Sequence, residues 1–165
     1  MAPVVQCSWH HTRRVFVEHS VHIDHPVEAA RAVLALGPGE WFDRLDGSGH
    51  AGVGPQVGGV PLRKDVTIEV GEPVTSGDWT EVPITWKATF IEQLFPVMVG
   101  KVELAPADAQ TTRLTVSGMY EPPLGRLGKQ LDDALMHKVA QATVRDLAET
   151  IGKTVDVRAS SQAAR

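Results

Sequence analysis

Alternation of apolar and polar residues is the clearest pattern in the chain, and it predicts several β-strands. In residues 13–24, one face carries Val15, Val17, His19, Val21 and Ile23, and the other carries Glu18, Ser20, His22 and Asp24. Successive side chains of a strand point to opposite faces, so this period of two indicates a half-buried strand. One histidine then lies on its apolar face.

Four further alternating runs cover residues 62–70, 82–90, 97–104 and 113–120. The expected inner positions are Leu62, Val66, Ile68 and Val70, then Val82, Ile84, Trp86, Ala88 and Phe90, then Met98, Gly100, Val102 and Leu104, and finally Leu114, Val116, Gly118 and Tyr120. The opposite faces are rich in charged residues, which is typical of an antiparallel sheet with one face on a core. Turn-rich segments at 72–78 and 105–111 fit hairpin connections.

The last long segment, residues 121–153, predicts a helix that begins after Pro122 and Pro123 and ends at Gly152. Positions spaced by four carry Leu127, Leu131, Leu135, Val139, Thr143, Leu147 and Ile151. A spacing of four exceeds the 3.6-residue turn, so this stripe moves around the helix by roughly 40° per step. A second face carries Met136, Ala140, Val144, Leu147 and Ile151. We therefore expect a helix that is packed from more than one side.

Shorter elements lie between the first strand and the other strands. A short helix is expected from about Pro26 to Gly37, and one further helical turn around Trp41. Residues 47–61 are rich in glycine and predict turn and loop, with a short strand pairing as an option. Residues 1–12 are expected to form a flexible lead-in, 13–153 a single domain, and 154–165 a frayed tail.

Composition narrows the class of protein. The chain has 165 residues, 42% of them hydrophobic and 22% charged, which suits one domain with a substantial core. Its net charge of −4 comes from interspersed charges, so we expect no nucleic-acid partner. We also expect no stable membrane insertion and no secretory signal. Cys7 is the only cysteine, which favours a cytoplasmic protein without disulfides.

Three parts of the sequence resemble one known superfamily over about residues 13–153. They are VFVEHSVHIDHPVEAARAVLAL, Trp41 and SGMYEPPLGRLGKQLDDALMHKVAQATVRDLAETI. In this order they resemble the START-like (SRPBCC) superfamily, which includes the birch-pollen-allergen-like proteins and the polyketide cyclase/dehydrase and lipid-transport group. The resemblance implies an α+β helix-grip fold: a curved antiparallel sheet wrapped around a long C-terminal helix, with two short helices after the first strand. It also implies a cavity for a lipid, steroid, polyketide or similar molecule.

On this basis we expect the chain to bind a hydrophobic small molecule, with no cofactor, as a monomer or homodimer. The expected ligand-binding residues are Val17, His19, Val21, Ile68, Ile84, Trp86, Phe90, Val102, Val116, Tyr120, Leu127, Leu131 and Leu135. Apolar burial would drive binding, and the polar ends of His19 and Tyr120 would orient the ligand. The glycine-rich loop and the turn at Phe95 and Pro96 would form the mouth.

Two alternatives stay open. The same cavity could serve a cyclase, aromatase or dehydratase, in which His19, Tyr120 or Glu103 would do the acid–base chemistry. The chain could instead be an interaction or stress-response module with a vestigial cavity. No nucleophile elbow is present, so we favour a binding protein over an enzyme.

Several single features have simpler interpretations. His19 could be a hydrogen-bonded core residue, and the aromatic residues could be plain core. Gly118 favours either an empty space or a close approach of the helix. A metal site of His19, His22 and His25 is not expected, because a strand points His22 away from the other two.

Overall fold

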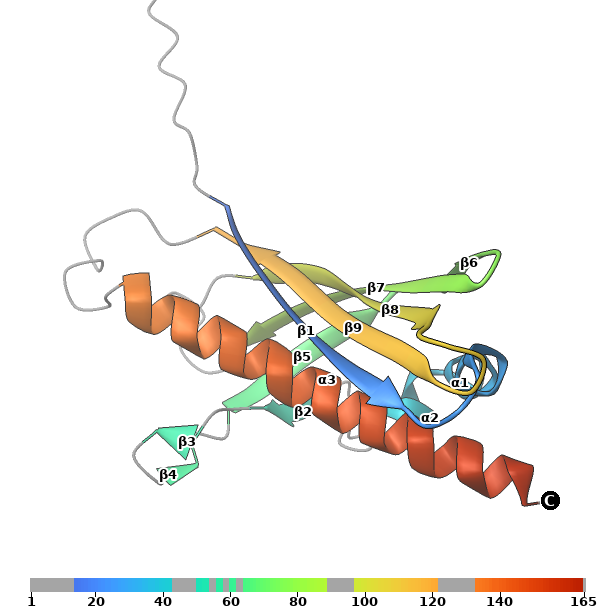
Figure 1. Ribbon diagram of the computed structural model, residues 1–165. Coiled ribbons are helices and arrows are strands. Elements are labelled where there is room, and N and C mark those ends of the chain that lie inside the picture. The colour runs from blue at the N-terminus through green and yellow to red at the C-terminus, as the bar shows by residue number, and fades with distance from the viewer. Residues whose placement is uncertain are drawn as a thin grey trace, which may run out of the picture.

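A curved antiparallel sheet packs on a long C-terminal helix, and two short helices close one end (Figure 1). This computed structural model describes residues 14–42, 50–53, 56–57, 60–61, 64–88, 97–121 and 133–164. The expected α+β helix-grip architecture is confirmed. Several expectations fall outside these residues: the lead-in at 1–12, the mouth at Phe95 and Pro96, the start of the last helix after Pro123, and the positions of Leu62, Phe90, Leu127 and Leu131.

Within the described residues the main sheet has seven strands. Six follow the order β1-β9-β8-β7-β5-β2, and β6 pairs with β7 beside them. Their bounds are β1 Val15–Ile23, β2 His50–Val53, β5 Lys64–Val70, β6 Val74–Ser76, β7 Trp79–Ala88, β8 Met98–Pro106 and β9 Thr112–Tyr120. A separate two-stranded sheet joins β3 (Gln56–Val57) and β4 (Val60–Pro61). The short pairing that the sequence left as an option in residues 47–61 is therefore present. The prediction of turn and loop is wrong for His50–Val53, which form β2 at the edge of the main sheet.

One connection is shorter than the sequence predicts. The segment 72–78 was expected to be a turn, yet it contains β6, and β7 begins at Trp79. Gly77 has a φ of 57°, a left-handed conformation that glycine adopts without steric cost. This glycine allows a tight hairpin in which Ser76 already pairs with Trp79.

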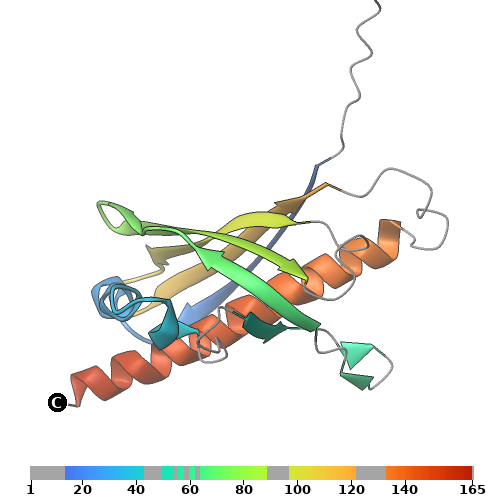
Figure 2. The ribbon, with the colours of Figure 1, turned by 180° about the vertical axis from the view of Figure 1, so that it is seen from behind.

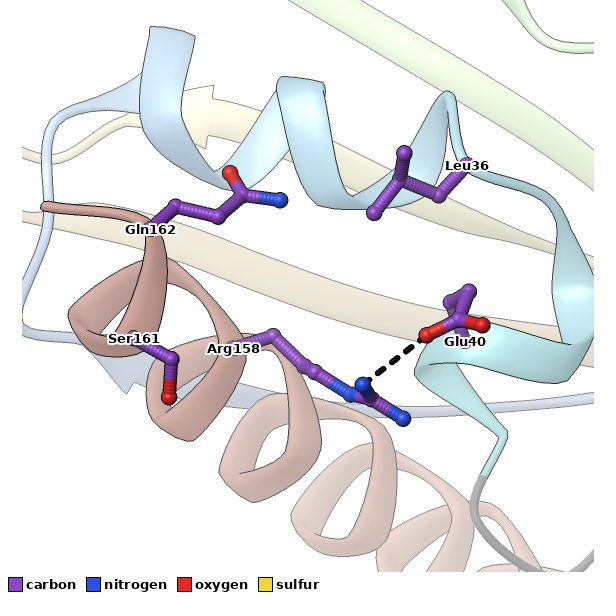
Figure 3. A pocket seen from close by; sticks show the side chains of 5 residues that line it. All are labelled: Leu36, Glu40, Arg158, Ser161 and Gln162. Carbon is purple, nitrogen blue, oxygen red and sulfur yellow. Dashed lines mark ion pairs between the residues drawn. The ribbon is translucent and has the colours of Figure 1, made fainter. Parts of the chain in front are cut away.

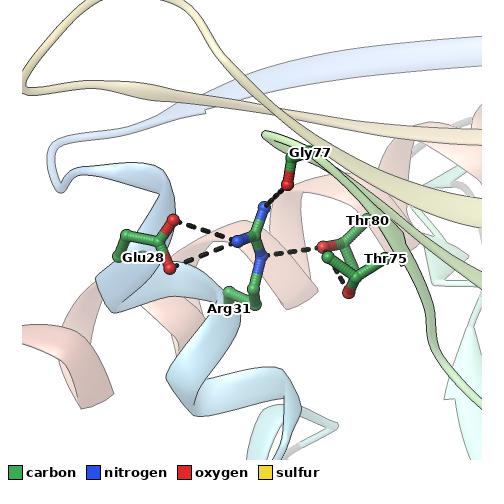
Figure 4. Close-up of polar contacts among 5 residues, drawn as sticks. All are labelled: Glu28, Arg31, Thr75, Gly77 and Thr80. Atoms are coloured by element: carbon green, nitrogen blue, oxygen red, sulfur yellow. Dashed lines mark hydrogen bonds and ion pairs between the residues drawn. The ribbon is translucent and has the colours of Figure 1, made fainter.

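The short helices α1 (Val27–Leu34) and α2 (Pro38–Trp41) cover the end of the sheet where β1 finishes. Arg31 of α1 holds the β6–β7 hairpin (Figure 4). Its guanidinium donates to Thr80 Oγ1 at 2.9 Å and to the carbonyl oxygen of Gly77 at 3.1 Å, and it pairs with Glu28 at 3.0 Å. One side chain thus connects α1 with a distant hairpin.

The terminal helix α3 spans Asp133–Ala163, so the prediction that it ends at Gly152 is wrong. The predicted frayed tail after residue 153 is helical as far as Ala163. The buried stripe explains this, because Val155 and Ala159 continue it by steps of four from Ile151 and are at most 2% exposed. Gly152 serves packing instead, since a Cβ atom there would lie 2.6 Å from Cγ2 of Val21. Its missing side chain lets α3 approach β1 closely.

Polar contacts fix the C-terminal half of α3 to the end of β1. The backbone N–H of Asp24 donates to Asp156 Oδ1 at 2.9 Å, and His25 Nε2 is 2.9 Å from Ser160 Oγ. Thr112 Oγ1 also donates to the carbonyl oxygen of His25 at 2.7 Å. Because Asp24 meets Asp156, the N-terminal half of α3 extends towards the Val15 end of the sheet. Figures 1 and 2 show that helix and sheet diverge in that direction.

No helix among the described residues is both long and apolar enough to span a membrane.

Candidate functional site

The concave face of the sheet ends in a row of large side chains near the N-terminal half of α3. Ile68, Trp86 and Met98 are register partners on β5, β7 and β8, and Tyr120 of β9 pairs with Val15. Ile68, Trp86, Met98 and Tyr120 are between 3% and 7% exposed. Alternation on four strands explains why they share one face. The row forms one wall of the candidate site, and it contains three residues of the predicted ligand-binding set.

The next row contains a pair of glycines that accommodates Trp86. Gly100 and Gly118 are register partners, flanked by Val17 and Ile84. A Cβ atom on Gly118 would lie 2.6 Å from Cη2 of Trp86. The indole ring therefore occupies the place of the missing side chain. Neither sequence-based interpretation of Gly118 is correct, because it meets neither an empty space nor the helix: the Trp86 side chain reaches it from β7, across β8.

His19 lies at the centre of β1, on the same face as these rows. It is half-buried, and its neighbours in register are Val116, Val102 and Val82. His19 forms no hydrogen bond or ion pair within the described residues. The structure therefore does not support the alternative that His19 is a hydrogen-bonded core residue. An imidazole in such surroundings can bind a polar group of a ligand or exchange a proton with it. Val21 lies one row further on and packs against Gly152 of α3.

Trp86 carries a polar group that the site does not satisfy. Its Nε1 atom is buried and has no hydrogen-bond partner within the described structure. Trp41 shares this property, but its ring packs against Phe42 at a centroid distance of 5.5 Å. Buried indole N–H groups normally find a partner. Within the described residues, Trp86 Nε1 is thus a fully buried donor of the candidate site that no acceptor satisfies.

The helix contributes small and flexible residues to this side of the molecule. Met136, Ala140 and Val144 are buried, whereas Val139 and Thr143 of the four-residue stripe are only half-buried. The second face predicted for the helix is therefore the one that packs. Leu135 belongs to α3, but its side chain is not among those described.

Glu103, a predicted acid–base candidate, lies on the opposite face of the sheet from His19. Its carboxylate accepts a hydrogen bond from Trp79 Nε1 at 2.8 Å and pairs with Lys101 at 3.0 Å. Partial burial alone would raise the pKa of Glu103, but the hydrogen bonds from Trp79 and Lys101 outweigh it and hold the pKa below its usual value. Hydrogen bonds to Glu81 and Glu103 raise the pKa of Lys101. Glu103 therefore belongs to a surface ion-pair cluster and not to the candidate site.

The three histidines lie as strand geometry predicts. His22 is exposed on the outer face beside Arg113, His19 faces inward, and His25 follows the strand and contacts Ser160. No group of three or more potential metal ligands occurs among the described residues.

Two surface hollows lie outside the concave face. One, of about 330 Å³, is bounded by Leu36, Glu40, Arg158, Ser161 and Gln162 (Figure 3). Arg158 and Glu40 form an ion pair of 2.9 Å there, which leaves neither charge free for a ligand. The other, of about 390 Å³, extends from the outer face to Tyr120 at the end of the wall, and it is lined by Arg14, Val97, Val99, Met119, Tyr120 and Glu121. The sequence does not predict these hollows, because each is bounded by elements that are far apart in the chain.

Comparison with known proteins places the fold but not a sequence family. No family model matches the chain, and no curated protein matches its sequence. A START superfamily protein from Mycobacterium smegmatis superposes with a TM-score of 0.50 at 12% identity, over 89% of this chain and 98% of that chain. A conserved protein from Geobacillus kaustophilus gives a TM-score of 0.51 at 16% identity, over 86% of this chain and 95% of that chain.

A third structure is the di-domain aromatase/cyclase StfQ from the steffimycin biosynthetic pathway. Its TM-score is 0.53 at 15% identity, over 92% of this chain and 53% of that chain. The chain thus spans about half of StfQ. At these identities the likeness defines the fold alone, and this fold is the START-like helix-grip fold.

Proposed function

We propose that the protein binds a hydrophobic small molecule between the concave face of the sheet and the N-terminal half of α3. One observation carries the proposal. Close packing and polar contacts attach α3 through its C-terminal half, whereas four large side chains gather at the other end of the concave face: Ile68, Trp86, Met98 and Tyr120. An apolar wall with few polar groups is what small-molecule sites usually offer.

Binding would draw on apolar burial, at roughly 25 cal/mol for each Å² removed from water. The wall extends from the row of Ile68, Trp86, Met98 and Tyr120 towards His19 through four further buried residues: Val17, Ile84, Val102 and Val116. The START superfamily protein and StfQ support the proposal only through their shared fold.

The proposal can be tested with the probe N-phenyl-1-naphthylamine, which fluoresces in apolar surroundings. The native protein should bind it, and Ala140→Phe and Met136→Trp should each weaken binding at least about fivefold, since both fill the space beside the wall. Val99→Phe is the matched control, because Val99 is 57% exposed on the outer face. Unfolding curves establish that each variant is folded.

Equal binding by the native protein and both filled variants would contradict the proposed location. No fluorescence with the native protein, combined with no compound retained in native mass spectrometry from its own host, would contradict binding altogether. A vestigial cavity would then be the better interpretation.

A second candidate is a dehydratase or cyclase, and His19 is the observation that favours it. Its half-buried imidazole faces the proposed cavity without a recorded partner among the described residues. It could take a proton from the carbon beside a ketone and return it to a departing hydroxyl, which leaves as water.

The substrate surrogate 4-hydroxy-4-phenylbutan-2-one distinguishes the two functions, because dehydration yields benzalacetone with a new ultraviolet absorbance. His19→Gln should abolish any turnover while probe affinity stays within about twofold, and His22→Gln on the outer face should change neither. Turnover that survives His19→Gln would exclude His19 as the base.

A further inference from the structure

We infer that Trp86 Nε1 is the ligand's hydrogen-bond donor, and that the cavity selects neutral apolar molecules bearing an acceptor oxygen, such as a ketone. This inference rests on the proposed function and specifies the ligand class of that same site. It depends on the juxtaposition of one buried, unused N–H with an apolar wall that lacks charge.

The position of the donor is fixed by packing. The far edge of the Trp86 ring, Cη2 and Cζ2, lies against the backbone of Gly118, at 2.6 Å and 3.2 Å from where a Cβ would be. The Cε atom of Met98 lies 3.4 Å from the same point. Any side chain at position 118 of β9 would displace the indole, so Gly118 is what allows Trp86 to extend across β8. Its N–H cannot easily turn elsewhere for a partner.

The cost of an unused donor favours a ligand as its partner. Trp86 is 3% exposed, and no acceptor reaches Nε1 in the part of the chain that is described. A buried donor without an acceptor destabilises a fold, so such groups are few and call for an explanation. Trp41 Nε1 is also buried without a partner, but it belongs to α2 at the other end of the sheet and not to the apolar wall.

The surroundings limit what the acceptor can be. The buried polar residues of the described chain are Thr80, Thr112 and Ser117, and none of its Asp, Glu, Lys or Arg residues is buried. An indole only donates, so it binds carbonyl, ether or hydroxyl oxygen. A carboxylate bound at Trp86 Nε1 would lose its hydration without gaining a counter-charge, because His19, the titratable side chain on this face, lies two rows away along β1. Such a loss is costly in an apolar site. The geometry therefore favours a neutral carbonyl compound over a fatty acid or another anion.

Three molecules that share one tricyclic ring system test this selection: fluorene, 9-fluorenone and fluorene-9-carboxylate. We expect calorimetry to show that the native protein binds fluorenone about three- to tenfold more tightly than fluorene, which is the range of one net hydrogen bond. The carboxylate should bind more weakly than fluorene.

Trp86→Phe keeps an aromatic ring at this position but removes the five-membered part of the indole with its N–H. It should abolish the preference for fluorenone while the affinity for fluorene changes less than about twofold. Trp41→Phe is the matched control, because it removes the other unpartnered indole and should retain the preference. In the ¹⁵N-edited NMR spectrum, the indole signal that disappears in Trp86→Phe should move downfield with fluorenone and not with fluorene.

The outcomes separate the two proposals. If fluorene binds but fluorenone is not preferred, or if Trp86→Phe keeps the preference, the assignment to Trp86 is wrong and the binding cavity stands. If the carboxylate binds most tightly, the selection for neutral ligands is wrong. If none of the three binds and N-phenyl-1-naphthylamine stays dark, both proposals are wrong.

Discussion

Gly100 and Gly118 show how single residues shape the concave face. A Cβ on Gly118 would meet the Trp86 ring at 2.6 Å, and one on Gly100 would clash with the carbonyl oxygen of Ser117. A side chain can yield more easily than backbone, so the two positions differ in tolerance. The sequence indicated a special role for Gly118 but could not identify its contact, because a cross-strand neighbour depends on register.

Gly118→Ala should therefore destabilise the protein by about 1–3 kcal/mol through overpacking, and Gly100→Ala should cost more. Urea unfolding measures both. Gly39→Ala is the control, since nothing lies within 4 Å of the Cβ it would add. A stable Gly118→Ala variant with unchanged tryptophan fluorescence would contradict the packing described for Trp86.

The ion-pair cluster on the outer face makes stability depend on acid pH. The pKa of Glu103 is lowered in the folded state, so its contribution is complete above the usual carboxyl pKa and is lost as pH falls through the folded value. Trp79→Phe removes one donor at 2.8 Å from this carboxylate. The pKa of Glu103 should then rise, and about 1 kcal/mol of stability at neutral pH should be lost.

A carbon-detected NMR titration of the Glu103 side chain measures the pKa, and urea unfolding from neutral pH down to about pH 3 measures the linkage. Asp78→Asn, in the neighbouring turn, should leave the titration of Glu103 unchanged. An unaltered pKa of Glu103 in Trp79→Phe would contradict the role of the indole hydrogen bond.

At the scale of elements, the strand pattern was the most predictable part of the chain. Alternation located β1, β7, β8 and β9 and the faces of most of their residues, because a period of two is a local property. The end of α3 was not predictable, since glycine usually stops a helix in isolation. Here tertiary packing of Val155 and Ala159 outweighs that local preference.

The extension of α3 should be part of the folded core. Val155→Ala removes a fully buried side chain and should cost about 1–3 kcal/mol. Val157→Ala changes the same residue type two positions later, where the side chain is 56% exposed, and should be nearly neutral. Chemical unfolding of the two variants compares them directly. Equal stabilities would show that the helix beyond Gly152 contributes nothing to the core.

At the scale of the whole molecule, the two ends of the grip differ. Arg31, Asp156 and Ser160 connect helices, hairpin and strand at one end, whereas the wall of the candidate site lies at the other. The sequence predicted the components of this wall, including Trp86 and Tyr120. Alternation places Phe16 on the outer face, but the sequence could not predict that Phe16 lies beside Met119 and Val99, because the order of the strands is a non-local property.

This asymmetry predicts a gradient in amide hydrogen exchange along α3. Residues 144–159 should exchange more slowly than residues 133–140, because packing and polar contacts hold the C-terminal half on both sides. Adding 9-fluorenone should slow exchange mainly in residues 133–140. Uniform protection along the helix in the ligand-free protein would contradict the unequal attachment.

The close contact between Gly152 and Val21 limits how α3 can move when a ligand enters the protein. If α3 slid along β1, a residue larger than glycine would have to face Val21. The helix therefore keeps its axial position on β1 and can move only by rotating about Gly152. Asp133 lies 19 positions before Gly152, which is about 28 Å along the helix at 1.5 Å per residue. If α3 rotates by a few degrees about Gly152, the distance between its N-terminal end and the sheet would therefore increase by an ångström or more, while the contact between Gly152 and Val21 hardly changes.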